Sequence, residues 1–593
     1  MGVSDRAISG VLGLLLGGAA LFPTEVRAFQ AAPPAPPQAQ PSVPTREQIE
    51  QRRQQEAPPR PRASVDTRRA IVQTPCALED SPLKVTLTSV TFQRPDGTPI
   101  HPELQQLLSA VDTGPAGEQS IAVVCRIRDQ ANQLLEDAGY VALAQILAQE
   151  IAGGQLKVTI VTARIVEVRV LGDGGPFQKG IERRIEAIRA LDPLNRRDAE
   201  RILLMTGDVP GVDVQLSLRS AGTRPGEVIG ELSVETSRSQ VLAKVQNYGS
   251  VQLGPVIASV QADAYGLTGL SDRTSIAYSN STDFDEIRVL QGGHDFALND
   301  RGLRAGLRGS LAFSNPDIDD LDLRSRSSIV GVELSQLLIR TLAQQLGVGV
   351  GFEAVEQRTR IHQGSSPIPF TRDRLRIAYA RLDGRIGTAL GSAGQAAAVT
   401  GYAEARKGLD ILGASEIGVT QGGFAPSRFE GNPEAWVLRS ELVADVRPFP
   451  ALAIGAQLFG QWANDPLLNL EEFSIGNFSY GRGYDPGSNG GDRALAFRIE
   501  PSLRLPLTPE SMSLWVLGFY DHIKLYNLDT GSTERERRIR SIGGGLRMLQ
   551  SRRFVLDLLY ARPLDRVLAT EESRPKERFL ASFTIQLQPW GVR

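Results

Sequence analysis

The sequence predicts a 16-stranded antiparallel transmembrane β-barrel preceded by two small α+β units, and three observations support this fold class. From Arg238 to Trp590, about sixteen strand-like segments alternate with Gly, Asn, Asp and Pro clusters. The 353 residues of that span divided by sixteen give about 22 per strand and connection, which suits membrane strands of ~10 residues. No run of 18 or more apolar residues follows the first 30, so no membrane helix is expected. Residues 76–237 add helical periodicities and therefore form separate domains.

Composition excludes several classes of protein. The chain has 593 residues, 41% of them hydrophobic and 22% charged, with 65 Lys and Arg against 67 Asp and Glu. This balance argues against a nucleic-acid-binding protein, which usually carries a basic excess. Two cysteines and four scattered histidines predict no zinc framework, and we expect neither a metal nor another cofactor. Because the sequence lacks a Gly-x-Ser-x-Gly elbow, a phosphate-binding loop and a paired-histidine motif, an enzyme is the least expected class.

Residues 1–28 are predicted to be a secretory signal peptide. Arg6 supplies a positive start, and the stretch from Ile8 to Phe22 is small and apolar but too short for a good spanning helix. Val26-Arg27-Ala28 places residues of small or moderate size where a signal peptidase cleaves. The alternative is an uncleaved anchor or a buried amphipathic helix.

The two cysteines, Cys76 and Cys125, are a candidate disulfide. A signal peptide directs a chain to an oxidising compartment, where such bonds form and persist. The alternative is a pair of buried free thiols.

Residues 29–75 are predicted to be a linker that contains one helix. The stretch 31–44 is rich in Pro, Ala and Gln, so we expect it to be extended or disordered. A helix is expected over 45–56, with Thr45 as its N-cap and Pro58-Pro59 after its end. Ile49 is its single large apolar residue, so this helix needs a polar environment such as water or a wet cavity.

Residues 76–163 and 164–237 predict two consecutive units with the same order of elements: strand, helix, helix, strand, strand. In the first unit we expect a strand over 83–92, a helix behind Pro102, a helix from Val124 to the C-cap Gly139, and strands over 142–150 and around Val158. In the second unit we expect a strand through Val166 and Val170, a helix through Ile181 and Ile188, a helix over 197–205 behind Asn195, and strands over 212–218 and 228–234.

Alternating apolar and charged residues mark the strands of residues 238–593, most clearly over 495–505. Such strands fit a soluble sandwich, whose charged face meets water, or a membrane barrel, whose charged face lines a wet lumen. Export, the number of strands and the aromatic-ended final segment from Phe579 to Trp590 favour the barrel. The aromatic content of 6% and Pro501, which suits only an edge strand or a bulge, argue against it.

The two α+β units resemble a tandem pair of POTRA domains, the periplasmic modules of outer-membrane assembly and secretion proteins. Pro210-Gly211-Val212, between a helix and a strand, resembles a step in the second POTRA domain of two-partner secretion transporters. Gly139-Tyr140-Val141 resembles a similar step in their first POTRA domain. The placing of Cys76 before the first strand and Cys125 at the second helix also resembles that domain. A sheet edge in such a unit can accept an extended client by β-augmentation, and the alternative is a mere spacer.

The segment from Phe473 to Gly487 carries the motif that narrows the family. Its core, Arg482-Gly483-Tyr484, resembles the Val-Arg-Gly-Tyr/Phe motif of the barrel-assembly and two-partner secretion superfamily, with Gly481 in place of Val. In that family the motif tips an extracellular loop that folds into the barrel, where the Arg pairs with an acidic residue of the thirteenth strand. The resemblance assigns this role to Asp521, with Phe519 on the same face and Ile523 in place of the family's Gly.

The resemblance covers nearly the whole mature chain and identifies it as a member of the two-partner secretion outer-membrane transporters (TpsB proteins, the haemolysin secretion/activation family). Asn247-Tyr248-Gly249-Ser250 also resembles the start of their barrels. The family implies two periplasmic α+β POTRA domains over 76–163 and 164–237, and an outer-membrane β-barrel over 238–593. It also implies that the helix over 45–56 lies in the pore as a plug.

This family implies a pore in the outer membrane of a Gram-negative cell. The POTRA domains capture a large unfolded exoprotein of the haemolysin or adhesin type, and the barrel passes it without ATP. The expected partners are therefore a secreted exoprotein and outer-membrane lipid, with no nucleic acid, and the expected state is a monomer, with a dimer as the alternative. The alternative functions are an outer-membrane protein insertase or assembly factor, and a passive porin.

Overall fold

A computed structural model of the chain describes residues 43–50, 65–69, 75–76, 78–114, 117–318, 321–363, 366–389, 396–476, 480–506, 512–550 and 553–588. The predicted signal peptide over 1–28 and the aromatic Trp590 lie outside these residues. The same is true of most of the Pro-rich stretch and of the second half of the predicted helix over 45–56.

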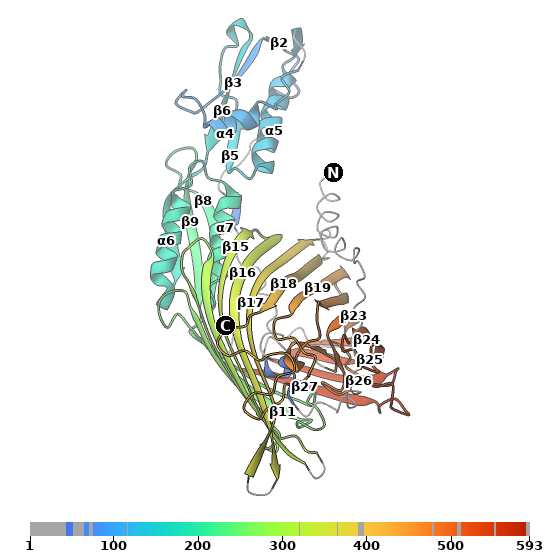
Figure 1. Ribbon diagram of the computed structural model, residues 1–593. Coiled ribbons are helices and arrows are strands. Elements are labelled where there is room, and N and C mark those ends of the chain that lie inside the picture. Colours follow the sequence, from blue (N-terminus) through green and yellow to red (C-terminus); the bar gives the residue numbers. More distant parts are fainter. Residues whose placement is uncertain are drawn as a thin grey trace.

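Sixteen antiparallel strands close into a barrel, which confirms the predicted fold class (Figure 1). The strands are β10 Ser239–Gln246, β11 Ile257–Tyr265, β12 Arg273–Ser281, β13 Ile287–Ala297, β14 Leu303–Ser314, β15 Asp322–Arg340, β16 Gln344–Gln363, β17 Ser366–Ala389, β18 Ala396–Gly408, β19 Trp436–Phe449, β20 Leu452–Ala463, β23 Arg493–Leu505, β24 Met512–Tyr526, β25 Glu536–Gln550, β26 Phe554–Pro563 and β27 Arg578–Gln588. No helix among the described residues has the length and apolar character needed to cross a membrane.

Over much of its surface the barrel turns apolar side chains outward and polar side chains into the lumen. On β16, Val348 and Val350 are exposed on the outer face, whereas Glu353 and Gln357 are buried on the inner face. The alternation predicted from the sequence therefore belongs to a barrel with a polar interior, because a sandwich would bury the apolar face instead.

Pro501 lies in the barrel wall, within strand β23. β23 pairs with β20 through this residue, but its pairing with β24 stops at Ile499 and resumes at Ser502. Proline has no N–H group to donate, so the ladder is interrupted there. The expectation of an edge strand or a bulge is wrong for Pro501, because β23 is paired on both sides and keeps its register with β24 across the local break in the ladder.

The first α/β unit contains more strands than predicted. The expected strand over 83–92 is divided at Thr88, and its first half pairs with an unpredicted strand. The elements are β2 Lys84–Leu87, β3 Ser89–Gln93, α4 Pro102–Leu108, β4 Gly117–Ser120, α5 Ala122–Asp137, β5 Ala142–Gln145 and β6 Gln155–Thr162. The sheets are β2-β4 and β3-β6-β5, and the helices bury Leu104, Leu108, Ile127 and Leu135 against them.

The structure joins Cys76 and Cys125 in a disulfide at the edge of this unit. Cys76 precedes β2, and Cys125 lies in the first turn of α5. The bond closes a segment of 49 residues. Cross-linking a segment of this length restricts the unfolded chain and so favours the folded unit.

The second α/β unit has the predicted order of elements, β7 Arg164–Gly172, α6 Gln178–Arg189, α7 Arg196–Gly207, β8 Val212–Ser220 and β9 Glu227–Thr236. Asn195 caps α7 through a hydrogen bond that its side chain accepts from the Arg197 amide, as predicted. The sheet has an additional edge strand, however, because β1 (Val65–Arg69) pairs in parallel with β8. The predicted linker over 29–75 therefore contributes a strand to a domain about 100 residues further along the chain.

Two glycine steps hold the units to their neighbours. Gly139 has φ +88°, and a Cβ there would come within 2.9 Å of Asn195 Oδ1, where the two α/β units meet. Gly211 has φ +83°, and a Cβ there would come within 2.6 Å of the Tyr265 ring on β11. Both close approaches need a residue without a side chain at a positive φ.

The second unit is also joined to the barrel by a partly buried ion pair. The guanidinium of Arg340, at the end of β15, donates two hydrogen bonds of 2.7 and 2.6 Å to Asp208, which follows α7. Paired bonds of this kind fix orientation as well as distance. The second unit therefore has a defined position beside the barrel opening (Figure 1).

Candidate functional site

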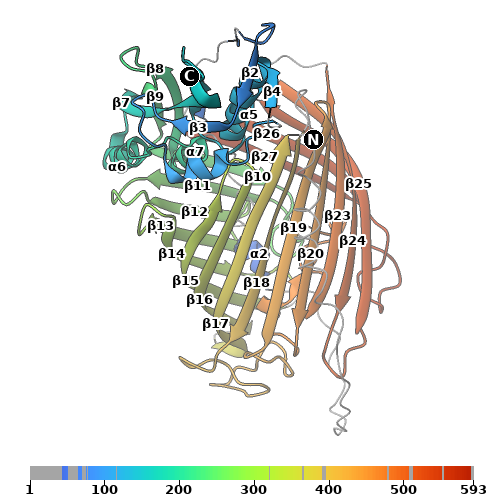
Figure 2. The same ribbon diagram turned by 90° about the horizontal axis from the view of Figure 1, so that it is seen from above.

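The lumen of the barrel contains two segments that are not part of its wall. The first is α2 (Arg46–Ile49), which lies inside the ring of strands in Figure 2. The second is the connection between β20 and β23, residues 464–492, which we call the inner loop. It includes η3 Asn469–Glu471, β21 Phe473–Ser474 and β22 Gly490–Gly491.

The helix α2 begins at the predicted residue. Thr45 is its N-cap, and the side chains of Thr45 and Gln48 satisfy each other's backbone amides in a capping box. Ile49 is fully buried in an apolar cluster of wall and loop residues, so the helix does not lie in an entirely wet cavity. That cluster includes Val289, Ile329, Val355, Leu375 and Leu470.

A network of buried charges ties α2 to the wall and to the inner loop. Arg46 of α2 donates to Glu353 of β16 at 3.1 Å and also to Glu471 of η3. Glu471 accepts further hydrogen bonds of 3.1 Å from Arg406 of β18 and from Arg439 of β19. Glu471 is therefore the point at which helix, loop and wall meet.

Glu471 is ionised in this network. Burial alone would raise its pKa, but the guanidinium groups of Arg406, Arg46 and Arg439 outweigh burial and hold the pKa well below its usual range. Removing one partner of a buried ion pair leaves the others without compensation, which is costly. The network therefore stabilises the arrangement in which α2 and the inner loop both occupy the lumen.

The predicted motif Arg482-Gly483-Tyr484 lies in the inner loop, against the wall. Arg482 is 5% exposed, and its guanidinium stacks 3.8 Å above the centre of the Phe519 ring on β24. Its Nη2 donates to Glu500 of β23 at 2.7 Å. Phe519 and Asp521 both face the lumen, as their parity on the thirteenth strand predicts.

The expected ion pair between the side chains of Arg482 and Asp521 takes a different form. Asp521 accepts from Arg498 Nε at 2.6 Å and from the backbone amide of Arg482 at 3.1 Å. The register of β23 and β24 places Arg498 directly opposite Asp521, so that cation reaches the carboxylate first. Asp521 therefore holds the backbone of the motif, whereas Glu500 pairs with the Arg482 side chain.

Gly483 and Tyr484 bring the loop close to the adjoining part of the wall, at β25 and the connection after β26. A Cβ on Gly483 would come within 2.8 Å of the Ser541 Cβ on β25. The Tyr484 side chain is fully buried, and its hydroxyl lies 2.7 Å from the Arg540 carbonyl and accepts from the Asp565 amide at 3.0 Å. Burial raises the pKa of Tyr484 to about 12, so the hydroxyl stays protonated and able to donate.

The two departures from the family motif lie in contact with each other. Gly481 has φ +79°, and a Cβ there would come within 3.1 Å of Ile523 Cδ1. Ile523 is fully buried beside Ile475 and Tyr480. The chain therefore has a small residue where the motif prefers a large one, and a large residue in the space opposite.

The stretch Asn247–Ser250 also contacts the loop and the closing strand. The Asn247 side chain donates to the Phe579 carbonyl at 2.8 Å and accepts from the Ala581 amide, which fastens it to β27. Ser250 Oγ donates to Asp485 of the inner loop at 2.8 Å. The end of the first strand is thus joined to the last strand and to the loop.

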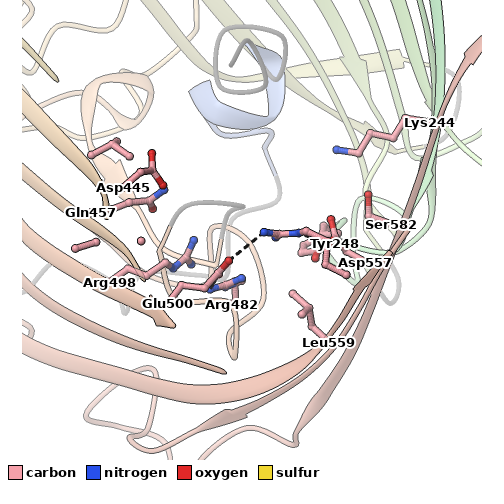
Figure 3. A pocket seen from close by; sticks show the side chains of 14 residues that line it. Lys244, Tyr248, Asp445, Gln457, Arg482, Arg498, Glu500, Asp557, Leu559 and Ser582 are labelled. Carbon is pink, nitrogen blue, oxygen red and sulfur yellow. Dashed lines mark hydrogen bonds and ion pairs between the residues drawn. The ribbon is translucent and has the colours of Figure 1, made fainter. Parts of the chain in front are cut away.

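A cavity of about 410 Å³ lies between the inner loop and the wall (Figure 3). Arg482, Arg498 and Glu500 border it on one side and Lys244 on the other, as Figure 3 shows. Asp445 and Asp557 add acidic groups. Basic and acidic side chains together suit a water-filled passage better than a pocket for one small ligand.

A second cluster of charges lies between the inner loop and two neighbouring connections, where one arginine forms ion pairs with three carboxylates. Arg428 donates to Glu472 at 2.7 Å, to Asp492 at 2.6 Å and to Asp529. These residues join the β18–β19 connection, the inner loop and the β24–β25 connection. Burial, with the nearby carboxylates of Asp492 and Asp529, raises the pKa of Glu472 to about 7 despite Arg428.

This raised pKa predicts that the loop cluster is less stable at alkaline pH. The proton on Glu472 contributes stability that is fully present below its ordinary pKa of 4.5 and is lost as pH rises through about 7. We expect the thermal unfolding midpoint of the wild type to match that of Glu472→Gln near pH 5 and to fall below it by pH 8. A difference that stays constant between these pH values would contradict the assignment.

Sequence reasoning found the motif residues but missed most of the charges that hold them. Arg482, Gly483, Tyr484, Phe519 and Asp521 come together in the lumen, whereas Cys76 and Cys125 lie far away in the first α/β unit. The network partners were not singled out, because acidic and basic residues on a lumen face have the same pattern as those on a solvated face. These partners are Arg46, Glu353, Arg406, Arg439, Glu471 and Glu500.

The chain is similar to one known protein family and to several solved structures. A family model, that of the haemolysin secretion/activation protein ShlB/FhaC/HecB, matches residues 232–548, which is 317 of the 593 residues. Among solved structures, CdiB from Escherichia coli is similar at 15% identity with a TM-score of 0.66, over 87% of this chain and 93% of that chain. CdiB from Acinetobacter baumannii is similar at 15% identity with a TM-score of 0.59, over 87% and 91%. No curated protein matches the chain.

Proposed function

Because the chain belongs to the haemolysin secretion/activation family ShlB/FhaC/HecB, we propose that it exports a large unfolded exoprotein of the haemolysin or adhesin type. The protein is an outer-membrane transporter of two-partner secretion, with its POTRA-like region in the periplasm and a secreted client as its partner. The family consists of transporters and not of enzymes.

The observation that supports this proposal is a barrel of sixteen strands whose lumen is occupied by α2 and the inner loop. The helix α2 and the inner loop are held in the lumen by side-chain contacts and not by strand pairing. Leaving the lumen would therefore require breaking ion pairs without opening the wall. We propose that Arg482, Gly483 and Tyr484, with Asp521 and Phe519, position the loop during export, and that no metal takes part.

We propose that the two POTRA domains, over 76–163 and 164–237, capture the client before it enters the barrel over 238–593. An extended segment can add to the open edge of a sheet. In the second domain the edge at β8 is occupied by β1, which leaves β7 as the other edge of that sheet among the described residues. Val170 and Leu171 of β7 are exposed, and Leu171 is 56% exposed. An edge strand with exposed apolar side chains is suited to such a contact.

A photo-crosslinking amino acid tests this capture. Placed at Leu171 in the full chain, it is expected to crosslink the exoprotein when export is arrested, and Leu342, exposed at the β15–β16 turn, is the matched control position. Equal crosslinking at both positions would contradict capture at β7. Released or surface-bound exoprotein in the same cells supports export, and loss of the POTRA domains without loss of transport would indicate a porin.

An insertase is the second candidate, and the closing seam of the barrel favours it. The strands β10 and β27 are paired at six positions, fewer than any other neighbouring pair in the described barrel. A short seam is the place where a barrel would open toward the membrane. An integrated barrel protein as the client, in place of a released exoprotein, would favour this function. For either function we propose a monomer, since one chain supplies the closed barrel, the plug and the loop.

A further inference from the structure

Seven arginines form a ladder on the outer face of β15, β16 and β17. They are Arg324, Arg326, Arg358, Arg360, Arg372, Arg374 and Arg376, and we call them the arginine ladder. The residues between them, such as Ser327, Gln357 and Asp373, are buried on the lumen side, and Gln357 reaches the Pro44 carbonyl beside α2. The alternation of a strand therefore turns the arginines away from the lumen.

The ladder places like charges directly opposite one another. In the antiparallel register, Arg324 faces Arg360, and Arg358 lies between Arg326 and Arg372. Residues opposite each other on one face have Cβ atoms about 5 Å apart, and like charges there are destabilising. Anions that are not part of the chain would reduce this repulsion if they bound between the facing arginines.

Within the described part of the chain, two carboxylates form ion pairs with the ladder. Arg324 pairs with Asp322 at 2.9 Å and Arg372 with Glu356 at 2.6 Å. Among the described residues no carboxylate forms an ion pair with the other five arginines, of which Arg326 stacks on Phe313 and Arg360 on Phe424. Arg374 and Arg376 instead donate to Gln421 and to the Leu412 carbonyl, so the ladder as described has more cations than paired carboxylates.

The position of the ladder matches the head groups of the outer leaflet. The chain enters β10 from the periplasmic side, so with alternating directions β15 begins, and the β16–β17 hairpin turns, on the extracellular side. This hairpin projects at the bottom of Figure 1. On the periplasmic side of the ladder the outer face becomes apolar, with Val330 58% and Val350 56% exposed. From Val330 to Arg326 is four residues, about 13 Å along the strand or about 10 Å along the membrane normal.

We propose that the arginine ladder binds the phosphate groups of outer-leaflet lipid, which in a Gram-negative outer membrane is lipopolysaccharide. Guanidinium groups form paired hydrogen bonds with phosphate oxygens, and a row of them matches a ligand with several phosphates. The patch adjoins the apolar band on its extracellular side, and Arg324 and Arg326 are exposed there, so a lipid reaches them directly. The β17 end of the ladder is partly covered by the β18–β19 connection, because Arg374 and Arg376 donate to Gln421 and to the Leu412 carbonyl. The bound phosphates neutralise the facing arginines and anchor one side of the barrel.

The test uses the full chain in detergent and measures its affinity for purified lipopolysaccharide at constant ionic strength. In the test variant, Arg326, Arg358 and Arg372 are all replaced by Gln, and the control replaces the exposed arginines Arg224, Arg301 and Arg574 by Gln. Each basic group near an anionic lipid surface contributes about fivefold, so the test variant is expected to bind about 100-fold more weakly. The control is expected to bind like the wild type, and lipopolysaccharide stripped of its phosphates is expected to bind all three weakly.

Three results would overturn the proposal. The first is equal binding by the test variant and the control, and the second is binding that survives removal of the lipid phosphates. The third is displacement by inorganic phosphate at the same concentration as the lipid, which would indicate a site for a free anion. Normal lipid binding with reduced export would assign the ladder to the exoprotein. Because the test variant removes repulsion, its unfolding midpoint without lipid should not fall, and the single change Arg358→Gln, expected at about fivefold, supplies a milder check.

Discussion

Glu471→Ala is expected to open the pore. The change leaves Arg46, Arg406 and Arg439 buried around a missing carboxylate, since all three donate to it. Removing one partner of a buried ion pair lowers the stability of the folded arrangement by about 3–5 kcal/mol. The closed arrangement bears this cost, whereas the arginines are solvated once α2 and the loop leave the lumen. We expect the open population to rise at least about a hundredfold, measured as conductance across a planar lipid bilayer.

Two variants make this result specific. Glu416→Ala removes an exposed carboxylate from the neighbouring β18–β19 connection and is expected to leave conductance unchanged. Glu471→Gln keeps the shape of the side chain but not its charge, and is expected to lie between the wild type and Glu471→Ala. Wild-type conductance in Glu471→Ala would show that the charge network does not hold the pore closed.

Arg482→Ala is expected to lower export of the exoprotein at least about tenfold while the barrel remains abundant in the outer membrane. The change removes the stack on Phe519 and the ion pair with Glu500, which hold the tip of the inner loop. The barrel wall is expected to stay folded, because the two carboxylates beside Arg482 each keep another arginine partner. Glu500 keeps Arg547 at 3.3 Å, and Asp521 keeps Arg498 at 2.6 Å.

The paired variant Arg498→Ala distinguishes loop position from barrel stability. Asp521 is fully buried, and without Arg498 it would lose its side-chain cation, so barrel abundance is expected to fall together with export. Secreted exoprotein and barrel abundance are measured in the same cells. Arg574→Ala, an exposed loop position, controls for the loss of one positive charge. Unchanged export in Arg482→Ala would remove the motif from the export mechanism.

The motif illustrates how far the sequence reaches. Arg482 and Asp521 could be paired from a resemblance and from strand counting, and both do lie in the same part of the lumen. The choice of partner could not be predicted, because it depends on the register that places Arg498 opposite Asp521. A register is a property of two strands, and no single segment of sequence contains it.

The linker strand is a second case. Residues 65–69 have no feature that distinguishes them from the rest of the linker, yet their backbone completes the edge of the second α/β unit. Backbone hydrogen bonds at a sheet edge accept many sequences, so such a strand has little signature of its own. It was therefore missed, although the helix start at Thr45 and the cap at Asn195 were found from local side-chain chemistry.

The local patterns of the sequence are enough to predict the class of this protein: a barrel of sixteen strands, two α/β units and a polar helix before them. These properties follow from periodicity, composition and turn residues, which act over a few positions and are readable along the chain. The groups that occupy the lumen, by contrast, depend on contacts between distant parts of the chain. Glu471 meets arginines from residues 46, 406 and 439, and such distant groups come together only when the barrel closes. The same closure turns one set of charges inward, to hold the plug, and the arginine ladder outward, to face the membrane.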